Sequence, residues 1–198
     1  MKKTFFILVF AISISLWAVP LQDVTWTQGV NVTINGNNLS CLSSNTWNSG
    51  AFSSQYIAAN TDGLVQTTVL ETSTHRMLGL SWDNQDAYWS SIDYALYLIA
   101  GNPIYVYENG VGRGYFGVYA TGDVVGIKRE GSTIQYYKNN VVFYTSSVSY
   151  SGILYADASL YEYGATLQNV QIGGVPEPCS FIFLFMGLGM LFFAKRIL

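Results

Sequence analysis

Histidine, cysteine and charged side chains are scarce in this chain. Its 198 residues contain one His, two Cys and 11% charged residues. A Ser-His-Asp triad would have to use His75, the only histidine, whose position between two strand patterns instead favours a solvated or locally hydrogen-bonded loop residue. One His and one exported Cys are too few for a zinc site of the Cys/His type. Cys41 is the only cysteine within residues 19–174, so no disulfide can close there. We therefore expect an ordinary hydrophobic core, in which Cys41 is a small buried residue.

Basic residues are outnumbered in the middle of the chain. Residues 19–174 contain five Lys or Arg and eleven Asp or Glu, which gives a formal charge of 5 − 11 = −6. A surface that binds nucleic acid needs clustered Lys and Arg to neutralise phosphates. The composition therefore argues against nucleic acid as a partner.

The N-terminus has the features of a secretory signal. Lys2 and Lys3 precede an apolar run over residues 5–19, and Ala18 is a small residue where signal peptidase could cleave. Positive residues beside membrane segments stay in the cytoplasm. We predict a signal peptide over residues 1–18, with export of the residues that follow it by the secretion machinery.

The last 24 residues contain three features in order. The motif Val175-Pro176-Glu177-Pro178 comes first, an apolar run over residues 179–194 follows, and the basic residues Lys195 and Arg196 lie near the end. As a helix the apolar run is about 24 Å long, short for a membrane core of about 30 Å unless flanking residues contribute. This arrangement resembles the PEP-CTERM sorting signal. The resemblance implies cleavage by an exosortase and transfer from the inner membrane to the cell surface or biofilm matrix of a Gram-negative bacterium. The alternative is an uncleaved transmembrane anchor.

Strand patterns fill the middle of the chain. Val30, Val32 and Ile34 alternate with polar residues, which predicts a strand with one buried face. Further strand patterns follow at spacings typical of sandwiches and barrels, over residues 63–70, 76–81, 92–99, 104–107, 115–119, 123–129, 133–138, 141–145, 153–160 and 165–172. We expect one all-β domain over residues 19–172, followed by a Gly173-Gly174 linker.

The clearest element is a hairpin within residues 122–146. A two-residue turn at Asn139 and Asn140 requires positive φ at both positions, which Asn tolerates. Because both faces carry large side chains, we expect the hairpin to lie in the centre of its sheet. The predicted register pairs Lys138 with Val141, Tyr137 with Val142, Tyr136 with Phe143, Gln135 with Tyr144 and Ile134 with Thr145.

Several motifs occur in a characteristic order: MLGLS (77–81), SSIDYALYL (90–98), VYENG (106–110), GDVVGIKREG (122–131) and YYKNNVVFYTS (136–146). This series resembles the concanavalin A-like, SPRY-like domains of bacterial surface proteins, although Asn140 replaces their usual Gly. The resemblance covers most of residues 29–172 and implies an antiparallel jelly-roll β-sandwich. It implies no particular ligand, because such sandwiches bind sugars, bind proteins or hydrolyse glucans.

The best candidate for a binding site is the segment WDNQDAYW, residues 82–89, between two strand patterns. Aromatic faces beside carboxylates and amides suit carbohydrate, and the candidates are Trp82, Asp83, Asn84, Asp86, Tyr88 and Trp89. Protein recognition uses the same residue types. The alternative is that the two Trp residues only cap the edge of the sandwich while the acids form turns.

We expect no catalytic residue and no cofactor. A glucanase needs two carboxylates about 5–10 Å apart, but the Glu-x-Asp-x-x-Glu motif of laminarinase-like enzymes is absent. Residues 83–86 offer oxygen ligands to calcium without the Gly and distal Glu of an EF-hand. The sequence thus favours a non-catalytic exported domain that binds exopolysaccharide. The alternative is an adhesin or matrix scaffold that binds surface proteins.

Overall fold

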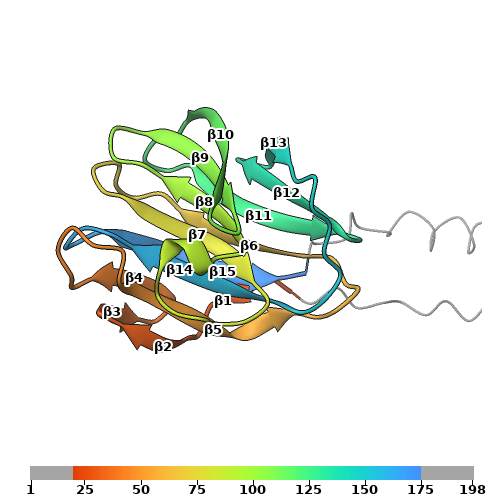
Figure 1. Ribbon diagram of the computed structural model, residues 1–198, viewed down its shortest axis with the longest axis horizontal. Coiled ribbons are helices and arrows are strands. Elements are labelled where there is room, and N and C mark those ends of the chain that lie inside the picture. The colour runs from red at the N-terminus through yellow and green to blue at the C-terminus, as the bar shows by residue number, and fades with distance from the viewer. Residues whose placement is uncertain (1–19, 175–198) are drawn as a thin grey trace, which may run out of the picture.

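The computed structural model describes residues 20–174 as two antiparallel sheets packed face to face (Figure 1). The only helical element in these residues is a 3₁₀ turn, Trp89–Ser91. The all-β prediction is therefore confirmed for this part of the chain. The predicted signal peptide and sorting tail lie outside the described residues, which include no helix of the length and apolarity needed to span a membrane.

Sheet A has eight strands in the order β13-β12-β11-β6-β15-β4-β3, with β1 paired to β15. The first residue of the predicted linker, Gly173, is the last residue of β15. The strands of sheet A are β1 (Gln22–Asp23), β3 (Val32–Asn35), β4 (Asn38–Cys41), β6 (Gly63–Thr68), β11 (Val124–Glu130), β12 (Thr133–Lys138), β13 (Val141–Thr145) and β15 (Thr166–Gly173).

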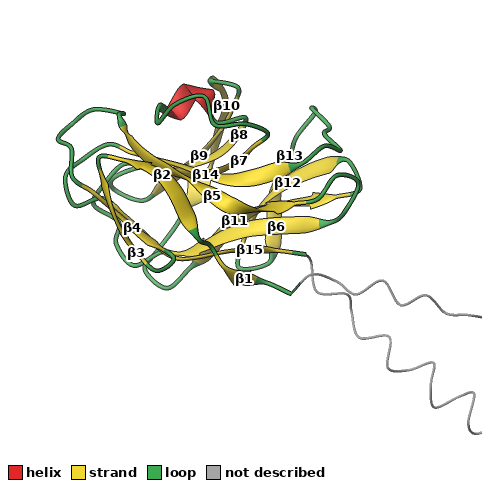
Figure 2. Cartoon of the chain, turned by 90° about the horizontal axis from the view of Figure 1, so that it is seen from below, coloured by secondary structure: helices red, strands yellow, loops and turns green. Residues whose placement is uncertain are grey.

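Sheet B has seven strands in the order β10-β9-β8-β7-β14-β5-β2. Their bounds are β2 (Trp26–Val30), β5 (Ser49–Ile57), β7 (Arg76–Ser81), β8 (Tyr94–Leu98), β9 (Pro103–Glu108), β10 (Val111–Val118) and β14 (Leu154–Leu160). Figure 2 shows the two sheets as layers, with the 3₁₀ turn on the side of sheet B that faces away from β1.

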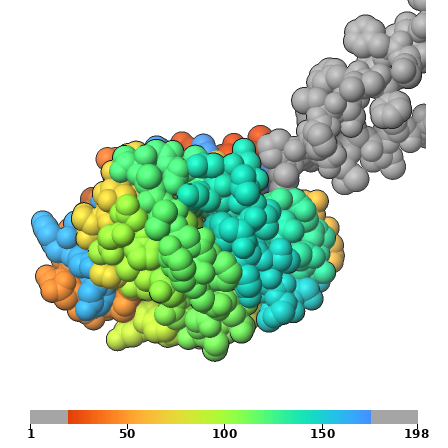
Figure 3. Space-filling view, turned by 90° about the horizontal axis from the view of Figure 1, so that it is seen from above, coloured from red at the N-terminus to blue at the C-terminus, as the bar shows by residue number. Residues whose placement is uncertain are grey.

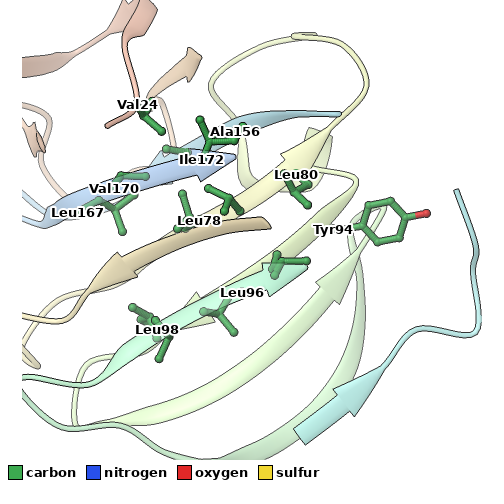
Figure 4. Close-up of a cluster of buried hydrophobic side chains, with 14 of the residues drawn as sticks. Val24, Leu78, Leu80, Tyr94, Leu96, Leu98, Ala156, Leu167, Val170 and Ile172 are labelled. Carbon is green, nitrogen blue, oxygen red and sulfur yellow. The ribbon is translucent and has the colours of Figure 1, made fainter. Parts of the chain in front are cut away.

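The core lies between the sheets because alternate residues of each strand point inward. Leu78 and Leu80 of β7 and Leu96 of β8 belong to this core (Figure 4). Met77 and Ala95, their neighbours in sequence, belong to a separate cluster on the outer face of sheet B. Cys41 is buried in the main core, as we expected.

The N-terminal strand prediction was wrong in two respects. The chain turns at Asn31, whose φ is 50°, so the expected strand is divided between β2 and β3. Val30 and Ile34 are both exposed, and only Val32 is half-buried against the core, so the expected buried face is reduced to one residue. Strand β5, which pairs with β2, is largely buried instead. It was not predicted, because its Ser- and Gly-rich sequence contains no strand pattern. Gly50 is needed there because an added Cβ would lie 2.2 Å from the Ala158 carbonyl oxygen.

The hairpin prediction was correct at its turn and wrong farther along. Asn139 and Asn140 have φ values of 49° and 65°, and the first two predicted pairs form. A bulge then pairs Tyr136 with Tyr144, which allows both Phe143 and Tyr144 to pack against the core. The hairpin does not lie in the centre of its sheet, because β13 forms the edge of sheet A.

Candidate functional site

Aromatic side chains line a hollow on the outer face of sheet B. Strand alternation directs Tyr97 of β8 and Tyr107 of β9 outward, because Leu96, Leu98 and Val106 point into the core. The 3₁₀ turn adds Trp89, whose ring centroid lies 5.2 Å from that of Tyr107, and the β4–β5 loop adds Trp47, 5.5 Å from Tyr97. With Met77, these residues line the aromatic hollow, which has a volume of about 180 Å³.

A larger polar hollow lies beside strand β2 and has a volume of about 410 Å³. Its floor is formed by Gly50 and Ala51 of β5, and its walls by residues 28–30 and residues 84–87. The side chains of Asn84 and Gln28 are hydrogen bonded across it. The polar hollow therefore presents amides and a carboxylate, that of Asp86, above small apolar residues.

A short segment, residues 87–89, separates the two hollows. Ala87 lines the polar hollow and Trp89 lines the aromatic hollow. The segment is fixed to strand β14 by a hydrogen bond, in which the Ser159 hydroxyl donates to the Ala87 carbonyl oxygen at 2.8 Å. Two residues of chain span at most about 7 Å, so the two hollows are adjacent parts of one face. We call this the binding face.

The backbone of the loop carrying the site is fixed by local hydrogen bonds. One carboxylate oxygen of Asp86, Oδ1, accepts from the Tyr88 N–H and from the Ser91 hydroxyl, each at 2.8 Å. No hydrogen bond within the described residues uses the other oxygen, Oδ2. Asp86 thus shapes the loop and still has an acceptor available beside the polar hollow.

Two buried acids, Asp93 and Asp157, lie beneath the same loop. The Ser81 hydroxyl donates to Asp157 Oδ2 at 2.7 Å, and the Trp82 N–H donates to Asp93 Oδ2 at 2.9 Å. The acids are 2% and 4% exposed, and neither forms an ion pair among the described residues. They are too buried to act as the open pair of carboxylates that a glycoside hydrolase needs.

Burial controls the ionisation of both acids. Loss of solvation raises the pKa of Asp157 to about 7, and the nearby charges of Asp93 and Asp86 act in the same direction. Burial also raises the pKa of Asp93 to about 7; the Trp82 N–H opposes this shift, and the charge of Asp83 adds a smaller contribution in the upward direction. At neutral pH the loop therefore packs over acids that are partly protonated.

The structure divides the six predicted binding residues. Trp89 lines the aromatic hollow, and Asn84 and Asp86 line the polar hollow. Tyr88 is exposed between them. Trp82 instead packs against the core and against Tyr150, with ring centroids 5.2 Å apart, and lines neither hollow. Asp83 is exposed in the loop and also lines neither hollow.

Three aromatic residues of the hollow, Trp47, Tyr97 and Tyr107, were missed from the sequence. The available signal was the outward position of Tyr97 and Tyr107 in strands whose alternate residues are aliphatic. The ring system continues to His75, which bonds to Glu162 and lies 6.0 Å from the Tyr97 ring. The residues described contain no group of three or more acids, His or Cys placed to hold a metal ion.

Solved structures of two kinds share this fold. A point mutant of the Emp46p carbohydrate recognition domain has a TM-score of 0.53 at 9% identity, covering 76% of this chain and 88% of that one. The TRIM65 PSpry domain has a TM-score of 0.52 at 13% identity, with coverages of 84% and 98%. A human SPRY domain has a TM-score of 0.51 at 14% identity, with coverages of 72% and 93%. The chain thus has a lectin-like and SPRY-like β-sandwich fold.

No family model matches the sequence, and no curated protein is significantly similar to it. At these identities the structural likeness shows the fold alone. Any assignment of a ligand depends on the binding face itself.

Proposed function

We propose that this protein is an exported surface or matrix protein whose non-catalytic sandwich binds carbohydrate on the outer face of sheet B. The observation that carries the proposal is the aromatic hollow directly beside the polar hollow. Sugar rings present C–H patches that pack on aromatic faces, and their hydroxyls pair with amides and carboxylates. Trp89 and Tyr97 supply the first kind of contact, while Asn84 and Asp86 supply the second.

The position of the two ends of the described chain supports a role at a surface. Strand β1 pairs with the last strand, β15, so both ends of the described chain lie at sheet A (Figure 2). The binding face lies on the outer side of sheet B. A domain held through its C-terminus would therefore keep the binding face clear of its attachment point.

Export and sorting are inferred from the terminal segments. Signal peptidase would remove residues 1–18, and an exosortase would act at the motif that begins with Val175. Before this processing the protein would be held in the inner membrane by residues 179–194. Afterwards it would reside at the cell surface or in the extracellular matrix, where the available ligand is exopolysaccharide.

The binding proposal is tested with the purified full chain and a panel of neutral glucan, mannan and galactan oligosaccharides. Trp89→Ala should weaken binding at least about tenfold, because it removes one wall of the aromatic hollow. Trp82→Ala is the matched control, since Trp82 belongs to the same loop and lines neither hollow. The proposal fails if no glycan binds, or if Trp89→Ala leaves the affinity unchanged.

A protein-binding adhesin or scaffold is the second candidate, and a different surface favours it. The edge strands β10 and β13 lie side by side, where the Phe116 and Tyr144 rings are 4.7 Å apart (Figure 3). This edge exposes several apolar side chains, with Tyr115 at 55% and Val141 at 69%. Exposed apolar edges are typical of interaction sites. This candidate would be supported if the wild-type protein and the Trp89→Ala variant captured a surface protein and the Val141→Lys variant did not.

A further inference from the structure

The binding face has no positive charge. The described residues contain five Lys or Arg residues and one His, which is paired with Glu162, and none of them lines the aromatic hollow or the polar hollow. Lys and Arg favour the binding of acidic polysaccharides, because they form strong charge-assisted hydrogen bonds with carboxylate, sulfate and phosphate groups. The positions of the five bases therefore bear directly on the class of glycan that the face accepts.

Each base is engaged elsewhere in the fold. Four form ion pairs: Arg76 with Glu71, Arg113 with Glu108, Lys128 with Glu130 and Lys138 with Asp123. The fifth, Arg129, is buried and donates to the carbonyl oxygens of Thr61, Ala58 and Gly152. No base is available to turn toward the binding face without losing these partners.

The charged side chain that lines the binding face is acidic. Asp86 lines the polar hollow, and Asp83 is exposed in the same loop. Asp93 and Asp157 lie beneath that loop, and because burial raises the pKa of each to about 7, they carry only part of their negative charge at neutral pH. An acidic group of a ligand placed in the polar hollow would meet like charge, and like charges at close range repel.

We infer that the glycan bound by this face carries no acidic groups and is either neutral or amine-bearing. This inference rests on the proposed function and narrows its ligand class. Because the two hollows adjoin across residues 87–89, neighbouring units of an extended chain would occupy both. If every other sugar unit of the chain carried an acidic group, one such group would therefore still lie near Asp86. Neutral units avoid this repulsion, and a protonated amine would be attracted to the free Asp86 oxygen.

The test uses one glycan backbone in three forms. The backbone is whichever neutral glucan, mannan or galactan binds the full chain most tightly. It is compared with the same oligosaccharide oxidised at C6 to the carboxylate and with the same oligosaccharide carrying primary amines at C6. At low salt the oxidised form should bind at least about tenfold more weakly than the neutral form, and the aminated form at least as tightly. Added salt should reduce both differences.

Charge removal at Asp86 separates electrostatics from shape. Asp86→Asn keeps an oxygen for the Tyr88 and Ser91 donors, so the loop should retain its conformation. The variant should raise the affinity for the oxidised form relative to the affinity for the neutral form several-fold, whatever lost hydroxyl contacts do to both. Glu130→Gln is the matched control, because it removes an exposed charge at Lys128 in sheet A and should change neither affinity.

Two results distinguish the possible failures. If the oxidised form binds as tightly as the neutral form or more tightly, the inference about charge is wrong while the binding proposal stands. Equal effects of Asp86→Asn on both forms would also overturn it. If none of the three forms of any backbone binds, the proposed function itself is contradicted, and the inference that rests on it falls as well.

Discussion

The rings of Trp89 and Tyr107 meet edge to face, with centroids 5.2 Å apart and planes at 81°. Trp89 comes from the turn after β7 and Tyr107 from the second strand beyond it, so this contact fixes the loop against the outer face of sheet B. An edge-to-face pair leaves part of each ring available for a ligand. The contact thus links the fold of the loop to the formation of the aromatic hollow.

Trp82 should contribute to stability and not to binding. Its ring packs on the core and on Tyr150, although the loop that carries it also forms the polar hollow. Trp82→Ala should therefore lower the free energy of unfolding by about 3 kcal/mol. Urea denaturation measures this change, and glycan affinity at a temperature where the variant is folded should match the wild type. A variant as stable as the wild type would show that the Tyr150 contact contributes little.

The buried acids should make the protein less stable as the pH rises from about 4 to about 7. Asp157 has its usual pKa of 3.8 when unfolded and a pKa of about 7 when folded. Between these values the unfolded state has released a proton that the folded state retains, so ionisation favours unfolding. Asp93 acts in the same direction. Each acid contributes a slope of at most about 1.4 kcal/mol per pH unit.

Asp157→Asn removes one of these contributions and keeps an acceptor for the Ser81 hydroxyl. The variant should show a shallower loss of stability over this pH range and should be more stable than the wild type above about pH 7. Denaturation curves at several pH values test this. Glu130→Gln, which alters an exposed acid, should leave the slope unchanged. Parallel wild-type and Asp157→Asn curves would show that Asp157 is ionised in the folded protein.

The two Asn residues of the β12–β13 turn should respond in opposite ways to glycine. Asn140 has a φ of 65°, so Asn140→Gly should relieve strain and raise the free energy of unfolding by about 0.5 kcal/mol. The Asn139 side chain bonds to Asp123 and to the Val124 N–H. Asn139→Gly removes both bonds and should destabilise the protein by about 1 kcal/mol. Equal effects of the two changes would contradict this division of roles.

The sorting proposal predicts a mature protein without its apolar tail. Mass spectrometry of the protein from cells that contain an exosortase should show loss of residues 179–198 and of the signal peptide. In cells that lack the exosortase only the signal peptide should be missing. A C-terminus at Leu198 in both kinds of cell would mean that the tail is an uncleaved anchor.

Most strands could be predicted from the alternation of their side chains, although the short strand β4 was not predicted. Leu78 and Leu80 point inward on β7, and Tyr97 points outward between inward leucines on β8. The pattern failed at β5, where small residues suffice because neighbouring strands approach closely at Gly50. It also failed at the bulge in β13, since the extra residue follows from core packing at Phe143 and leaves no local sequence signal.

The site was only partly readable for a related reason. Asn84, Asp86 and Trp89 belong to one short polar and aromatic segment, which local composition could identify. Trp47 and Tyr97 are 50 residues apart in sequence and meet only because β5, β14, β7 and β8 are neighbours in sheet B. Strand order depends on packing over the whole chain, so this half of the hollow required the structure.

Hydrogen exchange of the full chain with and without a saturating neutral oligosaccharide tests the central claim most directly. Carbohydrate on the outer face of sheet B should slow exchange in residues 82–92 and in β8 and β9, which carry Trp89, Tyr97 and Tyr107. Exchange along β10 and β13 should not change. Protection confined to the β10–β13 edge, or binding without protection in residues 82–108, would contradict the assignment of this face.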